Sequence, residues 1–176
     1  MKKSILLLFQ FLILIACDNQ VVQYPVSYQN DDFLKRSQER AKLLLQEEEF
    51  WFSEIQKKSN QKYNKTESGI WITNTGVKDN TMASLGDYIE FEYQVYDLEN
   101  NIIYPYSSNG RQKIILGKAD IPRGLQSGLQ LINEGEKARI LLPSFLGFGG
   151  FGDENKIKPD QPIIMDIEVF KIQKNK

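Results

Sequence analysis

The first extended pattern of apolar and polar positions lies between residues 31 and 58. Its apolar residues recur at spacings of three, four or seven, as in Leu34, Ala41, Leu45, Phe52 and Ile55. This periodicity predicts an amphipathic helix over 31–58, with Asp31 or Asp32 as its N-cap. The apolar stripe is wider than a solitary solvated helix needs. It fits either docking on the chain's own core or a homodimer formed through this N-terminal helix.

After Gly69 the period changes to two. The segment YIEFEYQVYD alternates apolar and polar residues, and alternation returns in EKARILL and IIMDIEVFKI. This pattern is typical of half-buried antiparallel strands. Between them, PRGLQSGLQLI places apolar residues at i, i+4 and i+7, which predicts one short helix. We therefore expect an α+β fold, an antiparallel five- to six-stranded sheet wrapped around one short helix, with the helix over 31–58 as an N-terminal extension.

Near the N-terminus, Lys2 and Lys3 precede an apolar run over 5–16, which is interrupted only by Gln10 and is too short to span a bilayer comfortably. The run ends at Cys17, the single cysteine of the chain. This segment resembles a bacterial lipobox, which implies cleavage before Cys17 and attachment of a lipid there. The alternative is an ordinary signal peptide or short anchor with an incidental cysteine. A lipid on Cys17 would hold the protein on the membrane surface of the bacterial envelope, facing the periplasm.

These features divide the chain into five segments. They are a lipoprotein signal peptide (1–16), a polar tether (17–30), the amphipathic helix (31–58), a polar linker (59–69) and the folded domain (70–176).

Composition excludes several classes of function. The chain has no histidine, which removes Ser-His triads and His metal ligands. Its formal net charge is −1, so we expect no nucleic-acid partner. The acidic stretch DLENN lacks the spacing of oxygen ligands that a calcium loop requires. We expect no metal and no cofactor, and a metal-dependent enzyme lacks the ligands it would need.

The stretch GFGGFG at 147–152 matches G-x-G-x-x-G. A dinucleotide site requires that motif to open a helix, and the following DENKIKPDQP has two prolines and no helical period. We instead predict a surface loop whose phenylalanines, Phe145, Phe148 and Phe151, supply an apolar wall for binding.

Three successive blocks carry a family resemblance. LGKADIPRGLQSGL, INEGEKARILLPSFLGFG and IKPDQPIIMDIEVFKI resemble FKBP-type peptidyl-prolyl isomerases in order and spacing, from about Ile70 to Ile172. The lipobox, the acidic helical leader and TESGIWI further resemble gliding-motility-associated FKBP-type lipoproteins of Bacteroidetes. The resemblance implies a pocket between the helix and the sheet. Its partners would be X-Pro segments of unfolded or exported proteins.

The resemblance also implies site residues. The catalytic wall would be formed by Tyr93, Ile121, Leu125 and Phe148. Substrate-binding positions would be Pro122, Ile157, Met165, and Tyr104 or Tyr106. Core packing alone would also explain several of these residues, above all Leu125 and Met165.

Two departures from the family pattern leave the function open. Pro122 has no N–H, so the backbone donor that binds the family's ligands is absent. No aspartate stands in the F-D slot of YPYSS, which removes an acceptor. The chain could therefore be an isomerase, active or weakly active, or a non-catalytic binding module with an altered pocket.

Overall fold

The computed structural model describes residues 31–73 and 82–175. The signal peptide predicted over 1–16, the tether over 17–30 and the lipidation site Cys17 lie outside the described residues. The chain divides into two compact units between Glu39 and Arg40. In the part of the chain that the structure describes, no helix combines the length and the apolar character needed to cross a bilayer.

The long helix α2 covers Asp31–Lys58, the span that the apolar period predicts. The other elements follow in chain order: β1 (Tyr63–Lys65), β2 (Trp71–Thr73), β3 (Tyr88–Tyr96), β4 (Ile102–Tyr104), α3 (Tyr106–Asn109), β5 (Gln112–Ile115), α4 (Arg123–Leu129), β6 (Lys137–Leu142), the 3-10 turns η3 (Ser144–Leu146) and η4 (Gly149–Phe151), and β7 (Ile163–Gln173).

The strands form one antiparallel sheet in the order β1-β2-β6-β7-β3-β4, with β5 paired to β3. The predicted fold class is confirmed, and the sheet has seven strands. The additional strand β1 lies inside the predicted linker over 59–69, so that part of the prediction is wrong. Tyr63 pairs with Thr73 and is buried, and this packing holds a short polar segment in the sheet.

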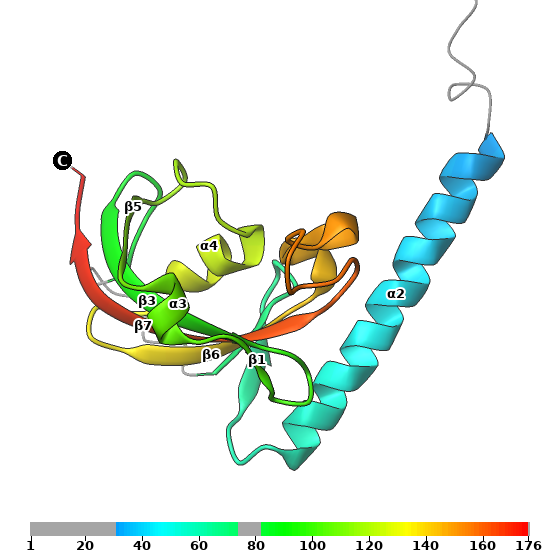
Figure 1. Ribbon diagram of the computed structural model, residues 1–176, viewed down its shortest axis with the longest axis horizontal. Helices are drawn as coiled ribbons and strands as arrows, with labels where there is room; N and C mark the ends of the chain where they lie inside the picture. The colour runs from blue at the N-terminus through cyan, green and yellow to red at the C-terminus, as the bar shows by residue number, and fades with distance from the viewer. Residues whose placement is uncertain (1–30, 74–81, 176) are drawn as a thin grey trace, which may run out of the picture. The chain divides into compact units, whose positions relative to one another are not determined.

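The main core lies between the sheet and α4, which sits on the concave side of the curved sheet (Figure 1). Leu125 and Leu129 of α4 are fully buried against inward-facing residues of β3, β6 and β7. The helix approaches β6 closely, because a Cβ added at Gly124 would lie 2.7 Å from side-chain atoms of Leu142. Glycine at this position therefore sets the distance between α4 and the sheet.

The opposite face of the sheet is covered, at the β2–β6–β7 end, by the part of α2 that belongs to the second unit. Phe52 is fully buried there in a cluster with Tyr63, Leu141 and Ile164. Its ring meets Trp71 edge-on, with 6.3 Å between ring centroids. The docking interpretation of the helix stripe is therefore confirmed for this segment. The homodimer stays a prediction.

Burial on both faces explains the sequence of β6. Ile140 and Leu142 face the α4 side, while Leu141 faces Phe52, so three consecutive residues are buried. Continuous apolar runs are expected wherever both faces of a strand are covered.

Candidate functional site

The strand register brings several predicted site residues onto one face of the sheet. Val95 of β3 pairs with Met165 of β7 on one side and with Tyr104 of β4 on the other. Side chains directly opposite one another in an antiparallel ladder share a face. Tyr93 precedes Val95 by two residues and so lies on this face too. Tyr93, Tyr104 and Met165 therefore face α4.

Seven predicted residues belong to the main core cluster on this face, and we call these seven residues the apolar site. Three are buried at its base and four are half-buried around it. The base is Leu125, Ile157 and Met165, and the half-buried members are Tyr93, Tyr104, Ile121 and Phe148. Because Leu125 and Met165 are fully buried, they shape the site from below, and the half-buried residues are the ones a ligand can touch.

Tyr93 packs against a neighbouring aromatic ring within the apolar site. Its ring stacks on Phe91 with 5.9 Å between ring centroids. Burial raises the pKa of the Tyr93 hydroxyl above its ordinary value, so the group is neutral at physiological pH. A neutral, half-buried phenol can donate a hydrogen bond while it keeps the surrounding surface uncharged.

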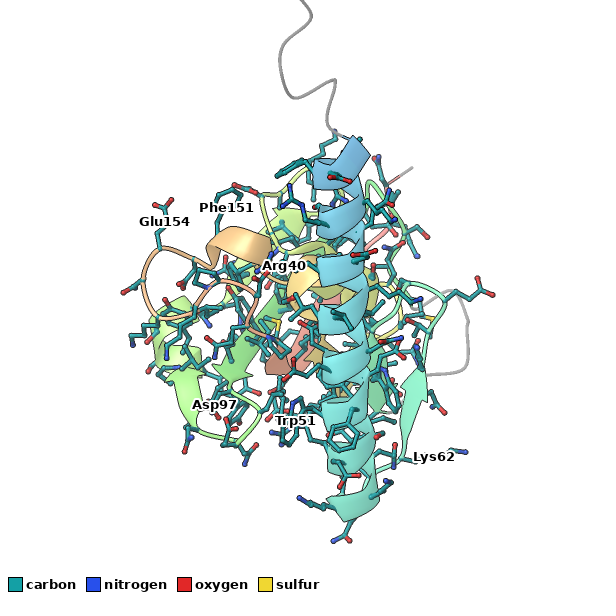
Figure 2. All side chains as sticks on the ribbon, turned by 90° about the vertical axis from the view of Figure 1, so that its right-hand side faces the viewer. Arg40, Trp51, Lys62, Asp97, Phe151 and Glu154 are labelled. Atoms are coloured by element: carbon teal, nitrogen blue, oxygen red, sulfur yellow. The ribbon has the colours of Figure 1, made fainter. Side chains whose placement is uncertain are left out.

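The glycine-rich loop contributes one of its three phenylalanines to the apolar site. Phe148 is half-buried and packs on the cluster, at the residue that precedes η4. Phe145 is 55% exposed and Phe151 is 87% exposed. Figure 2 shows Phe151 and Glu154 projecting outward from this loop. The expectation that all three phenylalanines form a wall is wrong for Phe145 and Phe151, because the turns at η3 and η4 direct them away from the cluster.

Asp153 connects two parts of the apolar site, and sequence reasoning missed it. The Tyr104 hydroxyl donates to Oδ2 of Asp153. Oδ1 accepts from the backbone N–H of Ile157 at 2.7 Å and from that of Asn155 at 3.0 Å. The bond from Asn155 is an Asx turn, a local pattern that an Asp after glycine could have indicated. The partner Tyr104, 49 residues earlier, has no such local signal.

The sequence predicts that the site lacks a carboxylate acceptor, because no aspartate stands in the F-D slot. In the structure, Asp153 supplies such a carboxylate. No aspartate stands directly after Tyr104 in the sequence, yet the glycine-rich loop supplies Asp153 from a distant part of the chain. Burial alone would raise the pKa of Asp153, but the hydrogen bonds from Tyr104, Ile157 and Asn155 together outweigh it and lower the pKa below its ordinary value. Asp153 therefore stays ionised and holds the Tyr104 ring over the cluster.

Tyr106 lies on the other face of the sheet, so its assignment as a site residue is wrong. Its backbone N–H approaches Oε1 of Gln94, and burial together with the nearby carboxylates of Asp166 and Glu168 raises its pKa. These carboxylates alternate along β7 with the inward-facing residues. Strand β4 ends at Tyr104 and α3 begins at Tyr106, so the strand alternation that would place both tyrosines on one face does not extend to Tyr106. Of the two tyrosines left open by the sequence, Tyr104 is the one at the apolar site.

Tyr106 lines a separate cavity of about 530 Å³, together with Thr73, Arg139 and Asp166 among others. None of the seven residues of the apolar site lines this cavity, although Ala138 and Ile167 of the same core cluster reach its wall. Its charged walls would stabilise a planar, charge-separated amide rather than a twisted one. We therefore place the candidate site on the α4 face.

The two residues that precede α4, Ile121 and Pro122, offer no free backbone donor. Pro122 is the N-cap residue and has no N–H. The N–H of Ile121 donates to the carbonyl of Ala119 at 3.1 Å. A ligand carbonyl at this edge of the site must therefore do without a hydrogen bond from either residue.

Comparison with known proteins agrees with this arrangement. The family model described as FKBP-type peptidyl-prolyl cis-trans isomerase matches residues 79–170, more than half of the chain. The chain belongs to this family. An FK506-binding protein of Neisseria meningitidis is 31% identical over 77 residues, which cover 43% of this FKBP-type chain and 71% of that protein.

Other relatives are longer. Human FKBP9, a peptidyl-prolyl cis-trans isomerase, is 25% identical over 92 residues, and the match spans 52% of this chain but 16% of that protein. FK506-binding protein 3 of Dictyostelium discoideum is 35% identical over 94 residues, and 48% of its length is matched. The FKBP-type domain is thus shared, while the remaining parts of these relatives have no counterpart in the match.

Solved structures show the same fold. A peptidyl-prolyl cis-trans isomerase of Pseudomonas syringae superposes with a TM-score of 0.61 at 21% identity, covering 76% of this chain and 96% of that chain. FkpA of Escherichia coli superposes with a TM-score of 0.59 at 16% identity, covering 98% of this chain and 82% of that chain. In residues 31–73 and 82–175 of this FKBP-type chain, no three acidic or cysteine side chains are grouped to hold a metal ion.

Replacing Asp153 by Asn is expected to lower the free energy of unfolding by about 1 kcal/mol at pH 7, because Tyr104 loses a charged acceptor. A lowered pKa in the folded state contributes stability above the ordinary aspartate pKa, and that stability is lost as the pH falls through the folded value. Urea unfolding of both proteins should therefore show a difference that shrinks from about pH 5 downward.

Glu154→Gln is the matched control, since it removes a neighbouring exposed carboxylate of the same loop. It should leave the urea unfolding curve nearly unchanged, both at pH 7 and below about pH 5. A difference between the Asp153 variant and the native chain that stays constant with pH would contradict the charge-assisted bond.

Proposed function

We propose that this chain catalyses the cis–trans isomerisation of X-Pro peptide bonds in exported proteins. The observation that carries the proposal is the apolar site, where Tyr93, Tyr104, Ile121 and Phe148 surround an apolar base in a domain of the isomerase family. These half-buried side chains offer a proline ring an uncharged surface with aromatic walls. The relatives that are isomerases by name support the same reaction.

The chemistry needs no acid, base or metal. Rotation about a peptide bond has a barrier of about 18–20 kcal/mol because resonance gives the C–N bond partial double-bond character. Resonance also separates charge, so a planar amide is better solvated by water than a twisted one. An apolar surface that accepts the prolyl amide disfavours the planar form relative to the twisted transition state. X-Pro bonds interconvert slowly without help, so such a surface is useful during folding.

Each part of the apolar site has a task in this mechanism. Phe148 and Ile121 contact the proline ring from the loop and from the start of α4. Tyr93 closes the sheet side, and its neutral hydroxyl can donate to a substrate carbonyl. Tyr104, held by Asp153, fixes the remaining wall. A rigid wall lowers the barrier because it fits the twisted amide better than the planar one.

Replacing Phe148 by Ala is expected to reduce kcat/KM for an X-Pro tetrapeptide about tenfold, since ~1.4 kcal/mol of lost transition-state contact corresponds to that factor. A protease-coupled assay at low temperature measures the rate. The matched control is Phe151→Ala, which removes the same side chain from an exposed position of the same loop. Its kcat/KM should stay within about twofold of the native value.

The alternative is a non-catalytic binding module. The absence of a free N–H at Ile121 and Pro122 favours it, because one hydrogen bond to a substrate carbonyl, worth roughly 0.5–1.5 kcal/mol net, is missing. The assay separates the two functions. An intact fold with no rate above background, together with binding of X-Pro peptides, would select the binding module and reject the isomerase.

The proposal also covers the cellular location of the protein. We infer that Cys17 carries a lipid, that the protein is held at the bacterial envelope facing the periplasm, and that its clients are exported proteins. The N-terminal segment supports this inference by its basic start, its short apolar run and its single cysteine. The resemblance to gliding-motility lipoproteins of Bacteroidetes adds a proposed role in assembling motility components.

Replacing Cys17 by Ser is expected to move the protein from the membrane fraction to the soluble fraction, because a serine cannot accept a thioether-linked lipid. Fractionation of cells and mass measurement of the N-terminal peptide check this. If the native chain is found in the soluble fraction, or if its Cys17 is unmodified, the lipid anchor is rejected. The isomerase proposal is not affected by that result.

A further inference from the structure

Helix α2 contributes a buried carboxylate to the start of the glycine-rich loop. Glu48 is 2% exposed, and both of its carboxylate oxygens accept from the backbone N–H of Ser144 at 3.2 Å. The Ser144 hydroxyl also hydrogen-bonds the carboxylate. Ser144 is itself buried and begins η3, four residues before Phe148. Glu48 therefore holds the point at which the loop leaves β6.

A second contact from α2 reaches the other end of the same loop. Arg40 forms an ion pair with Asp160. The backbone N–H of Asp160 donates to the carbonyl of Gly149 at 2.9 Å, which closes the loop on itself. The Arg40 side chain is 72% exposed, and exposed pairs of this kind contribute little to stability. The buried bond from Glu48 is therefore the stronger of the two contacts.

Docking of α2 on the sheet does not by itself require a carboxylate at position 48. Phe52, one turn further along α2, already anchors the helix on the sheet. Burying a carboxylate is unfavourable, and no cation is bonded to Glu48; burial raises its pKa above the ordinary value. An apolar residue at position 48 would pack more favourably but would leave the Ser144 N–H without this acceptor. We therefore attribute to the carboxylate the task of fixing the position of Ser144.

We propose that Glu48 is a positioning residue for the apolar site: by holding Ser144, helix α2 sets the path of the loop and so the placement of Phe148. This inference rests on the proposed isomerase function. It gives the helix outside the family match a role in the reaction, with Arg40 as a weaker second contact.

The test compares variants of the full chain by kcat/KM and by NMR. Glu48→Ala is expected to lower kcat/KM for an X-Pro peptide about fivefold to tenfold per folded molecule, at a temperature well below the unfolding midpoint. Glu48→Gln keeps an oxygen acceptor for the Ser144 N–H and should recover most of the rate. Glu47→Ala and Glu47→Gln are matched controls at a neighbouring exposed carboxylate and should behave like the native chain.

A merely structural role gives a different result. In that case Glu48→Ala lowers the unfolding midpoint while kcat/KM per folded molecule stays at the native value, and this outcome overturns the proposal. If Glu48→Ala does not fold, Glu48→Leu, which fills the site but offers no acceptor, is compared with Glu47→Leu. A rate for Glu48→Leu equal to that of its control, with unchanged amide shifts in the loop, also overturns the proposal.

An activity-independent readout separates this inference from the proposed function. The backbone amide resonances of Gly147, Gly149, Gly150 and Gly152 report the path of the loop. We expect them to move in Glu48→Ala and not in Glu47→Ala. If the native chain shows no isomerase rate, the proposed function fails, and the glycine resonances still decide whether Glu48 positions the loop. Unmoved resonances reject the positioning role even when the native chain is active.

Discussion

Replacing Gly152 by alanine is expected to destabilise the domain by about 2 kcal/mol or more and to remove most of the proposed isomerase activity. Gly152 has φ +69, a conformation that L side chains rarely adopt. A Cβ there would overlap the carbonyl oxygen of Ile157 and lie 2.9 Å from the carbonyl carbon of Lys158. Both neighbours are backbone, so the loop itself must move, and with it Ile157 at the base of the apolar site.

Two neighbouring glycines provide controls that separate the backbone strain of a positive φ from the steric overlap of an added Cβ with nearby atoms. Gly149 also has a positive φ, +61, but a Cβ there would meet open space, so its alanine variant reports strain alone, about 1 kcal/mol. Gly150 has no such φ, and its Cβ would make an ordinary 3.6 Å contact with Asp160, so its variant should be nearly neutral. Urea unfolding should rank the three alanine variants by their loss of stability, with the Gly152 variant losing most and the Gly150 variant least. An effect at Gly152 no larger than that at Gly149 would contradict the overlap.

Phe52→Ala is expected to lower the free energy of unfolding by about 3–5 kcal/mol, the range for truncating a fully buried phenylalanine. Phe52 is the largest fully buried side chain of the cluster that docks α2 on the sheet, and it shares this cluster with Leu141 and Ile164. Its loss leaves a cavity between helix and sheet that the rigid strands β6 and β7 cannot close. Urea unfolding with tryptophan fluorescence measures the change.

Phe50→Ala is the matched control, two residues away on the same helix. Phe50 is 56% exposed and contacts Trp51 edge-on with 5.5 Å between ring centroids, so its removal should change stability by less than about 1 kcal/mol. Equal effects of the two substitutions would show that the helix does not dock through Phe52. Hydrogen exchange over Arg40–Lys58 should also rise in the Phe52 variant.

The glycine-rich loop illustrates how a motif can match a well-known pattern for an unrelated reason. Its spacing equals that of a dinucleotide-binding turn, yet the segment that follows is not a helix. The loop instead closes on itself through Gly149 and Asp160, and Gly152 lies against the backbone at Ile157. Glycines occur here because the backbone passes close to itself, which places Phe148 on the apolar cluster.

The sequence by itself determined the elements whose information is local. The period of apolar residues placed α2 at Asp31–Lys58, and alternation identified the strands β3, β6 and β7. The spacing of Leu125 and Leu129 indicated α4. These patterns are readable because helix and strand periods are short compared with the length of the element. The ordered motif blocks then identified the family.

Tertiary structure alone decided which side chains meet. It chose Tyr104 over Tyr106, because β4 ends at Tyr104 and the second tyrosine lies beside the carboxylates of Asp166 and Glu168 on the other face of the sheet. It selected Phe148 from three equally spaced phenylalanines, and it brought Asp153 to Tyr104 and Glu48 to Ser144 across 49 and 96 residues. Such contacts depend on register, turn geometry and the close passage of distant segments, and none of these leaves a periodic trace in the chain.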